Sequence, residues 1–446
     1  MLADDRPEHP MTFVMRLVLS GEFERRAFAT AVELAVGRHP LLGAHVRRCG
    51  GRGLAWVPAL DPRPWIDYGA TSDPRTFPGA ERIDLGSSSG VRLWVRTARG
   101  RTEISAQFHH ACCDGLGAFR FLEDLLVAYD RAARPAADAA FRPLDVGLLR
   151  HRARFGLSWP RIALRLPVEL AGIVVGVAGL LLIRPAPLAT PSRPVLDAMA
   201  RLAVLDCPSH TFEPAESEEL LRAARDARAT LNDVVLHDML VTLHAWNVRH
   251  DSAARRRGLR IVFPVNLRGP RDGALPAANV VAMVFLDRRV DRFRDRGREL
   301  GRITLETRLV KKLRTSLAFV RCVAMLAAIP GALDVLTRAR RCYATGVFAN
   351  LGEVFADAPL PRRQGRLITG RLVLEEVHST PPVRPLTGVA LSLLSYAGRM
   401  TLDLNYDRHH LTAEAAGQLL RQLVARLRPT AVSTAPVQAA EPAAVR

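Results

Sequence analysis

One short stretch constrains the fold and the chemistry of this chain more than any other. Its residues are His109-His110-Ala111-Cys112-Cys113-Asp114-Gly115. Before it, residues 102–108 alternate apolar and polar side chains, which is typical of a half-buried strand. After it, residues 116–129 place apolar side chains at helical spacing. The pattern predicts two adjacent imidazoles at the end of a strand, and an imidazole held there can exchange protons near neutral pH.

The stretch resembles the HHxxxDG signature of the thioester-dependent acyltransferase superfamily. Members include chloramphenicol acetyltransferase-like enzymes, wax ester synthase/diacylglycerol acyltransferases, polyketide-associated acyltransferases and the condensation domains of nonribosomal peptide synthetases. The resemblance implies an α/β (α+β) fold of two chloramphenicol-acetyltransferase-like lobes. Each lobe is then a mixed sheet with flanking helices, and a tunnel runs between the two. It also implies that His110 is the catalytic general base, supported by His109, Asp114 and Gly115.

Three distant segments extend this resemblance. Residues 230–236 resemble the "LNDVxL" helix start of wax ester synthase-like enzymes, residues 264–268 resemble "PVNLR", and residues 350–352 resemble "N-L-G". In relatives the motif aspartate pairs with an arginine of "PVNLR", so we expect an ion pair between Asp114 and Arg268. A buried pair of this kind holds the shape of a loop and does no chemistry. The plant-type DFGWG motif is absent.

Two single residues in these segments carry further expectations. Asn279 follows Ala278 where many relatives have Gly-Asn, and the resemblance carries it over as a substrate-binding residue. In the "LNDVxL" segment, Asn232 or Asp233 is a suitable N-terminal cap for the helix that follows.

The order of predicted elements indicates two lobes of similar build. Residues 91–98 and 101–108 form a hairpin before the motif helix, and residues 389–396, 400–405 and 412–427 repeat the hairpin and helix. A strand near 202–207 opens the second half. The predicted parts are an N-terminal lobe at 1–150, a crossover with an apolar segment at 151–200, a C-terminal lobe at 201–430 and a disordered tail at 431–446. The second histidine pair, His409-His410, lacks a following Asp-Gly and is expected to be non-catalytic.

Charge and cysteine content narrow the classes of partner and compartment. The formal charge is +19, but the chain has no dense basic run with interleaved aromatic residues and no nucleic-acid module. We therefore expect no nucleic-acid partner. Six cysteines without a CxxC pair favour a reducing compartment. The polar, acidic first residues do not resemble a secretory signal, so a cytoplasmic protein is expected.

The same motif offers chemistries other than a general base. Cys112 or Cys113 beside a histidine could act as a nucleophile. The two cysteines with His109 and His110 could bind zinc, but ligands so close in sequence do not easily reach one tetrahedral centre. Residues 86–90 match GxSxG, yet a strand follows them where a nucleophile elbow requires a helix. The sequence favours no metal and no permanently bound cofactor.

The sequence contains two apolar segments, 170–183 and 316–336, and does not decide whether they touch a membrane. A spanning helix needs about 20 apolar residues, so buried helices or an interfacial, membrane-touching surface fit better. The expected reaction moves an acyl group from acyl-CoA, or from a carrier-protein thioester, to a hydroxyl or amine acceptor that is lipophilic. The thioester is a co-substrate, and the partners left open are a carrier protein and a membrane surface. The alternative is a non-catalytic condensation-like module that binds a carrier protein or a lipid.

Overall fold

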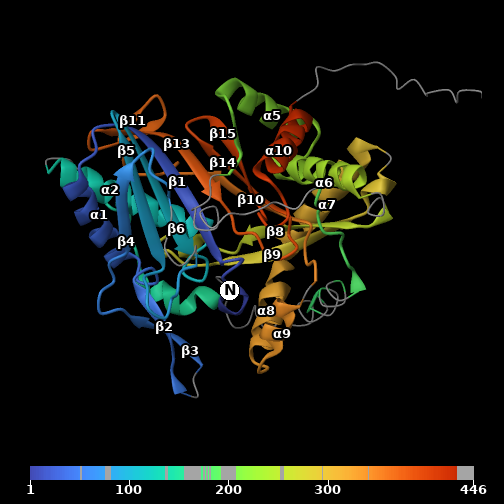
Figure 1. Ribbon diagram of the computed structural model, residues 1–446, viewed down its shortest axis with the longest axis horizontal. Helices are drawn as coiled ribbons and strands as arrows, with labels where there is room; N and C mark the ends of the chain where they lie inside the picture. The colour runs from blue at the N-terminus through green and yellow to red at the C-terminus, as the bar shows by residue number, and fades with distance from the viewer. Residues whose placement is uncertain are drawn as a thin grey trace, which may run out of the picture.

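Two mixed β-sheets with helices packed against them make up the protein (Figure 1). The computed structural model describes residues 1–50, 53–75, 82–135, 139–154, 182–191, 207–251, 256–293, 295–339 and 341–428, with positions 172, 173, 176 and 179. The sheets meet along β13 (Leu372–Thr380), which lies against β14 (Val389–Tyr396) and β15 (Arg399–Tyr406). The predicted fold of two lobes, each a mixed sheet with flanking helices, is confirmed.

The first sheet has β1 at its centre and carries the histidine motif at the end of β6. Its strand order is β11 (Arg362–Arg363), β12 (Arg366–Thr369), β13, β1 (Thr12–Gly21), β6 (Arg101–His109), β5 (Val91–Ala98) and β4 (Trp65–Ala70). Only the β4–β5 pair is parallel among these described strands. Helices α1 (Arg25–Arg38) and α2 (Gly115–Ala133) pack together, and their apolar faces share one core with the strands.

The second sheet is built from the other half of the chain. Its strand order is β7 (Ser209–Phe212), β15, β14, β10 (Gly346–Glu353), β8 (Leu259–Asn266) and β9 (Val281–Arg288). Strand β10 runs parallel to both of its neighbours. The core of this lobe lies between the sheet and four helices, α5 (Pro214–Asp226), α6 (Leu231–His250), α7 (Arg296–Leu313) and α10 (Ala413–Leu427).

Smaller elements surround the sheets. They are the two-stranded sheet of β2 (Ala44–Arg48) and β3 (Leu54–Pro58), helices α8 (Ser316–Ala327) and α9 (Ala332–Arg338), and the 3-10 helices η1 (Leu2–Asp4), η3 (Val146–Arg154), η5 (Pro270–Asp272) and η6 (Val290–Arg292). Both predicted hairpins and the helices that follow them are present. The predicted tail and most of the predicted crossover and its apolar segment lie outside the described residues. So does most of the expected strand near 202–207.

One predicted boundary is wrong in part. The predicted C-terminal lobe includes residues 362–380, but their strands β11, β12 and β13 extend the first sheet, with β13 antiparallel to β1. Without β13, one edge of β1 would lack backbone partners. The local pattern of a strand does not say which sheet it joins, because apolar alternation suits either core.

The N-terminal cap of α6 also differs from the prediction. The cap is Thr230, whose side chain accepts a hydrogen bond from the backbone N–H of Asp233. The Asp233 carboxylate accepts in return from the backbone N–H of Thr230, at 3.0 Å. This reciprocal pair is a capping box, and it leaves Asn232 inside the first turn of the helix.

Candidate active site

His110 stands directly after the last residue of β6. Its backbone N–H donates to the carbonyl oxygen of Met11 at 2.7 Å. The edge of its ring meets Phe13, with 5.0 Å between ring centroids. The side chain is half-buried, so part of the imidazole remains accessible. The neighbouring strand β1 therefore holds both the backbone and one side of the ring.

Asn279 lies against His110, a contact that sequence reasoning missed. Its Nδ2 donates to the carbonyl oxygen of His110 at 2.7 Å and lies 3.1 Å from Nδ1 of the ring. The sequence predicted a substrate-binding role for Asn279. The structure places its amide on the candidate base itself, where it can position the imidazole.

Burial lowers the pKa of His110, and hydrogen bonding to its own carbonyl oxygen and the charge of Asp114 only partly offset this effect. Desolvation acts in this direction because it disfavours the charged imidazolium. At neutral pH the ring is consequently uncharged and ready to accept a proton.

Asp114 forms the predicted ion pair with Arg268. Nη1 of Arg268 donates to Oδ2 at 2.8 Å, and Nη2 donates to Oδ1 at 2.9 Å. The backbone N–H groups of Gly117 and Val280 donate to the same two oxygens, each at 2.8 Å. The carboxylate is buried and each oxygen already accepts two hydrogen bonds, so Asp114 ties α2 to the chain before β9. It has no oxygen left for proton transfer.

Two glycines allow this close packing around the start of α2. A Cβ added to Gly115 would lie 2.5 Å from a methyl carbon of Leu351, which belongs to the predicted "N-L-G" segment. A Cβ on Gly117 would lie 2.8 Å from the backbone oxygen of Ala278. Backbone moves less easily than the end of a leucine side chain, so Gly117, which the sequence did not single out, is the more constrained position.

His109 points away from His110 toward the N-terminal segment. Its Nδ1 accepts from the backbone N–H of Ala111 at 3.0 Å, and its Nε2 lies 3.6 Å from Oδ2 of Asp5. Asp5 also accepts from the backbone of Met11 and from Arg82, at 2.9 and 2.6 Å. The first residues of the chain look like an unstructured polar start in sequence, and nothing in their pattern indicates this contact.

The rival chemistries find no support in the described residues. Cys112 and Cys113 are fully buried, and burial raises the pKa of both thiols, which opposes formation of a thiolate nucleophile. The segment 86–90 is a turn before β5, and a Cβ on Gly90 would collide with Sγ of Cys112. No group of three or more His, Cys, Asp or Glu side chains in the described ranges could hold a metal ion.

The second histidine pair lies on a turn after β15 and outside the first site. The backbone N–H of His409 donates to Oδ1 of Asp407 at 2.9 Å, and Nε2 of His410 lies 3.7 Å from Oδ2. His9 shares that carboxylate at 3.1 Å. The pair thus helps to hold the N-terminal segment.

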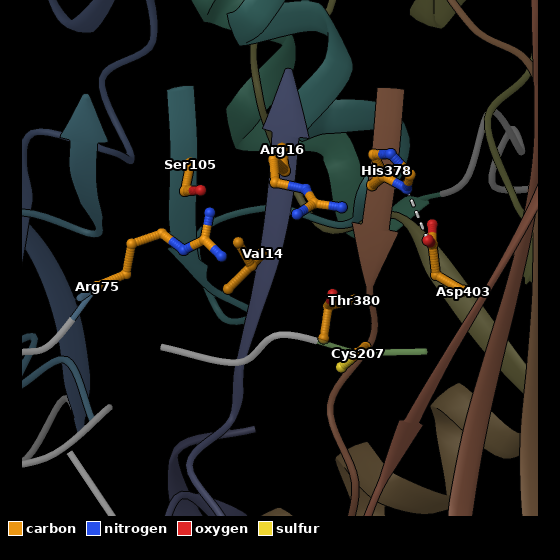
Figure 2. A pocket seen from close by; sticks show the side chains of 8 residues that line it. All are labelled: Val14, Arg16, Arg75, Ser105, Cys207, His378, Thr380 and Asp403. Carbon is orange, nitrogen blue, oxygen red and sulfur yellow. Dashed lines mark hydrogen bonds and ion pairs between the residues drawn. The ribbon is translucent and has the colours of Figure 1, made fainter. Parts of the chain in front are cut away.

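A small polar cavity lies where the two sheets meet (Figure 2). A hydrogen bond between His378 of β13 and Asp403 of β15 joins the two sheets, with 2.8 Å between Nδ1 and Oδ1. Burial opposes protonation of His378, but its hydrogen bonds to Asp403 and Glu376 outweigh burial and raise its pKa. The cavity volume of about 20 Å³ is close to the space of one water molecule. It is too small for an acyl substrate, and it marks a buried contact between the lobes.

Sequence comparison finds only distant relatives. No family model matches the chain. An uncharacterized protein of Mycobacterium tuberculosis, found in two strains, is 28% identical over 301 residues. The match covers 62% of this chain and 62% of that protein. The chain therefore spans about three fifths of the length of the curated relatives it matches.

Several solved structures have a similar fold across nearly the whole chain. Polyketide synthase associated protein 5 from Mycobacterium tuberculosis has a TM-score of 0.59 and 17% identity, covering 94% of this chain and 93% of that one. The first condensation domain of the calcium-dependent antibiotic synthetase has a TM-score of 0.64 and 16% identity, covering 95% and 91%. A starter condensation domain of rhizomide synthetase, in complex with C8-CoA and Leu-SNAC, has a TM-score of 0.62 and 14% identity, covering 95% and 89%. The chain has the two-lobed fold of these condensation-type proteins.

Proposed function

We propose that this protein is an acyltransferase that moves an acyl group from acyl-CoA, or from a carrier-protein thioester, to a hydroxyl or amine acceptor. One observation carries the proposal: His110, directly after β6, presents a half-buried imidazole whose pKa is lowered. Within the described part of the chain, its Nε2 forms no hydrogen bond. A neutral ring with one free nitrogen is the chemical form that a general base needs.

The proposed base requires the tautomer with its proton on Nδ1, so that Nε2 keeps its lone pair for the incoming proton. In this tautomer the Asn279 amide, whose Nδ2 lies 3.1 Å from Nδ1, donates to the carbonyl oxygen of His110 at 2.7 Å and not to the ring. The Asn279 side chain, packed against Nδ1, limits rotation of the imidazole ring.

The proposed reaction runs in two steps on this single base. The acceptor O–H or N–H gives its proton to Nε2 as its oxygen or nitrogen bonds to the thioester carbonyl carbon. The tetrahedral intermediate then expels the sulfur, and the imidazolium returns the proton to give a free thiol. No acyl-enzyme is required, and general-base assistance of this kind contributes about 10²–10⁴-fold to the rate.

The fold supports the class of reaction without naming a substrate. A similarly folded starter condensation domain has been solved in complex with C8-CoA and Leu-SNAC. We carry the thioester donor over to this chain as part of the proposal. The tunnel between the lobes and the lipophilic character of the acceptor stay predictions.

Thiol release in the presence of acceptor tests the proposal. The full chain is incubated with a series of acyl-CoA chain lengths and with alcohol or amine acceptors, free thiol is measured, and products are identified by mass spectrometry. We expect thiol release that depends on the acceptor and yields one acylated product. Binding of acyl-CoA with no release for any acceptor would instead identify the non-catalytic condensation-like module.

Replacing Asn279 with alanine should lower kcat about tenfold, the loss expected from one hydrogen bond that orients the base. The KM values for acyl-CoA and acceptor should stay the same, because the amide touches His110 and not the substrate in this proposal. Steady-state kinetics of N279A separates the two roles. A raised KM with unchanged kcat would restore the substrate-binding role predicted from sequence.

A further inference from the structure

The turn between α8 and α9 exposes apolar side chains that the fold does not cover. We call residues 324–335 the α8–α9 tip. Met325, Ile329 and Val335 are 56%, 57% and 75% exposed, and most of the small residues between them are exposed as well. Water-exposed apolar groups gathered in one place indicate a contact with something apolar.

Packing inside the protein does not account for this surface. The buried residues of α8 are confined to its first turn, at Ser316, Leu317 and Ala318, and α9 has none. The tip projects from the body of the molecule at the lower side of Figure 1. The sequence of residues 316–336 is compatible with buried helices or with an interfacial surface. The exposed apolar side chains favour the interfacial surface.

The segment around the tip is mostly basic. Residues 307–335 contain five Arg and Lys residues and one acidic residue, Asp334 in the first turn of α9. The basic residues include Lys311 and Lys312, the only lysines of the chain, and both are exposed at the end of α7. Basic residues beside exposed apolar ones complement an anionic lipid surface, which attracts each cation and accepts the apolar groups below its headgroups.

The size of the tip favours a membrane over a protein partner. The tip spans 12 residues, 324–335, whereas a specific protein interface takes about 20–30 residues on each side. A second exposed apolar site also favours a membrane. The β2–β3 hairpin projects at the lower side of Figure 1, and Leu54 and Val57 are exposed on it. One flat surface could therefore meet both projections.

The helices of the tip are short. No single described helix is long and apolar enough to span a membrane, and the only pair that passes together, α8 with α9, is bent by 115°. With its 12 residues, α8 is about 18 Å long, while the hydrocarbon core measures about 30 Å. The tip is suited to shallow insertion.

We infer that the α8–α9 tip docks this protein on an anionic membrane by inserting Met325, Ile329 and Val335 among the headgroups, with Lys311 and Lys312 at the rim. This inference is independent of the proposed function, because within the described residues no hydrogen bond or ion pair joins these side chains to His110 or Asn279. It identifies the lower face of the molecule in Figure 1 as the side turned toward lipid.

Vesicle flotation of the full chain tests the inference. The wild type should float with vesicles of equal parts phosphatidylcholine and phosphatidylglycerol, and much less with phosphatidylcholine alone. The double variant M325D/I329D should lower the bound fraction about tenfold or more, since two apolar insertions are lost. The double variant K311E/K312E should lower it about tenfold at low salt, and added salt should weaken wild-type binding.

Leu221→Asp is the matched control. Leu221 is an exposed leucine of α5, far from the tip in Figure 1, so this variant should float like the wild type. Circular dichroism and thiol release with water-soluble substrates report whether each variant is folded. Flotation that M325D/I329D leaves unchanged, or that Leu221→Asp reduces equally, overturns the inference. So does a wild type that floats with neither vesicle, including one whose tip instead mediates dimers or binds a carrier protein.

Discussion

Replacing His110 with alanine should reduce acceptor-dependent thiol release by about 10²–10⁴-fold, the contribution expected of a positioned general base. The ring is half-buried beside Phe13 and forms no ion pair with any residue that the structure describes, so the variant should remain folded. The measurement is kcat/KM for the best acyl-CoA and acceptor found with the wild type.

His409→Ala is the matched control, because it removes an exposed histidine of the second pair and should leave the rate unchanged. The pH profile adds an independent check. Activity requires neutral His110, and its pKa lies below the usual value of a histidine, so the rate should rise with pH and the midpoint of that rise should lie below about pH 6.5. Full activity of H110A would remove the proposed base.

The second large effect is on stability. Asp114→Ala should lower the free energy of unfolding by about 3–5 kcal/mol, the usual result of removing one member of a buried ion pair. Arg268 would lose its bidentate partner, and the N–H groups of Gly117 and Val280 would lose their acceptor. Urea unfolding followed by tryptophan fluorescence measures the change.

A double-mutant cycle shows whether the loss belongs to the pair. Asp114→Ala combined with Arg268→Met should cost much less than the sum of the two single changes, because no unpaired charge remains buried. Asp61→Ala is the control, since it breaks an exposed ion pair with Arg63 and should leave the unfolding midpoint in place. Additive losses in the cycle would mean that Asp114 and Arg268 stabilise the fold separately.

The local elements around the motif were predictable because their signals are local. Strand β6 alternates in sequence and α2 repeats at helical spacing, so both elements appear where periodicity places them. The pairing of Asp114 with Arg268, 154 residues apart, followed from family resemblance and not from periodicity.

By itself the sequence determined the strand, turn and helix that present His110, because spacing along the chain sets which side chains share a face. Tertiary structure alone decided that β13 joins the first sheet, that Asn279 and Asp5 reach the two histidines, and that the α8–α9 tip stays uncovered. Each of these depends on which distant segments meet when the two cores close. Apolar pattern is the same for a strand in either sheet, and a polar side chain shows its partner only once the backbone has brought the two together.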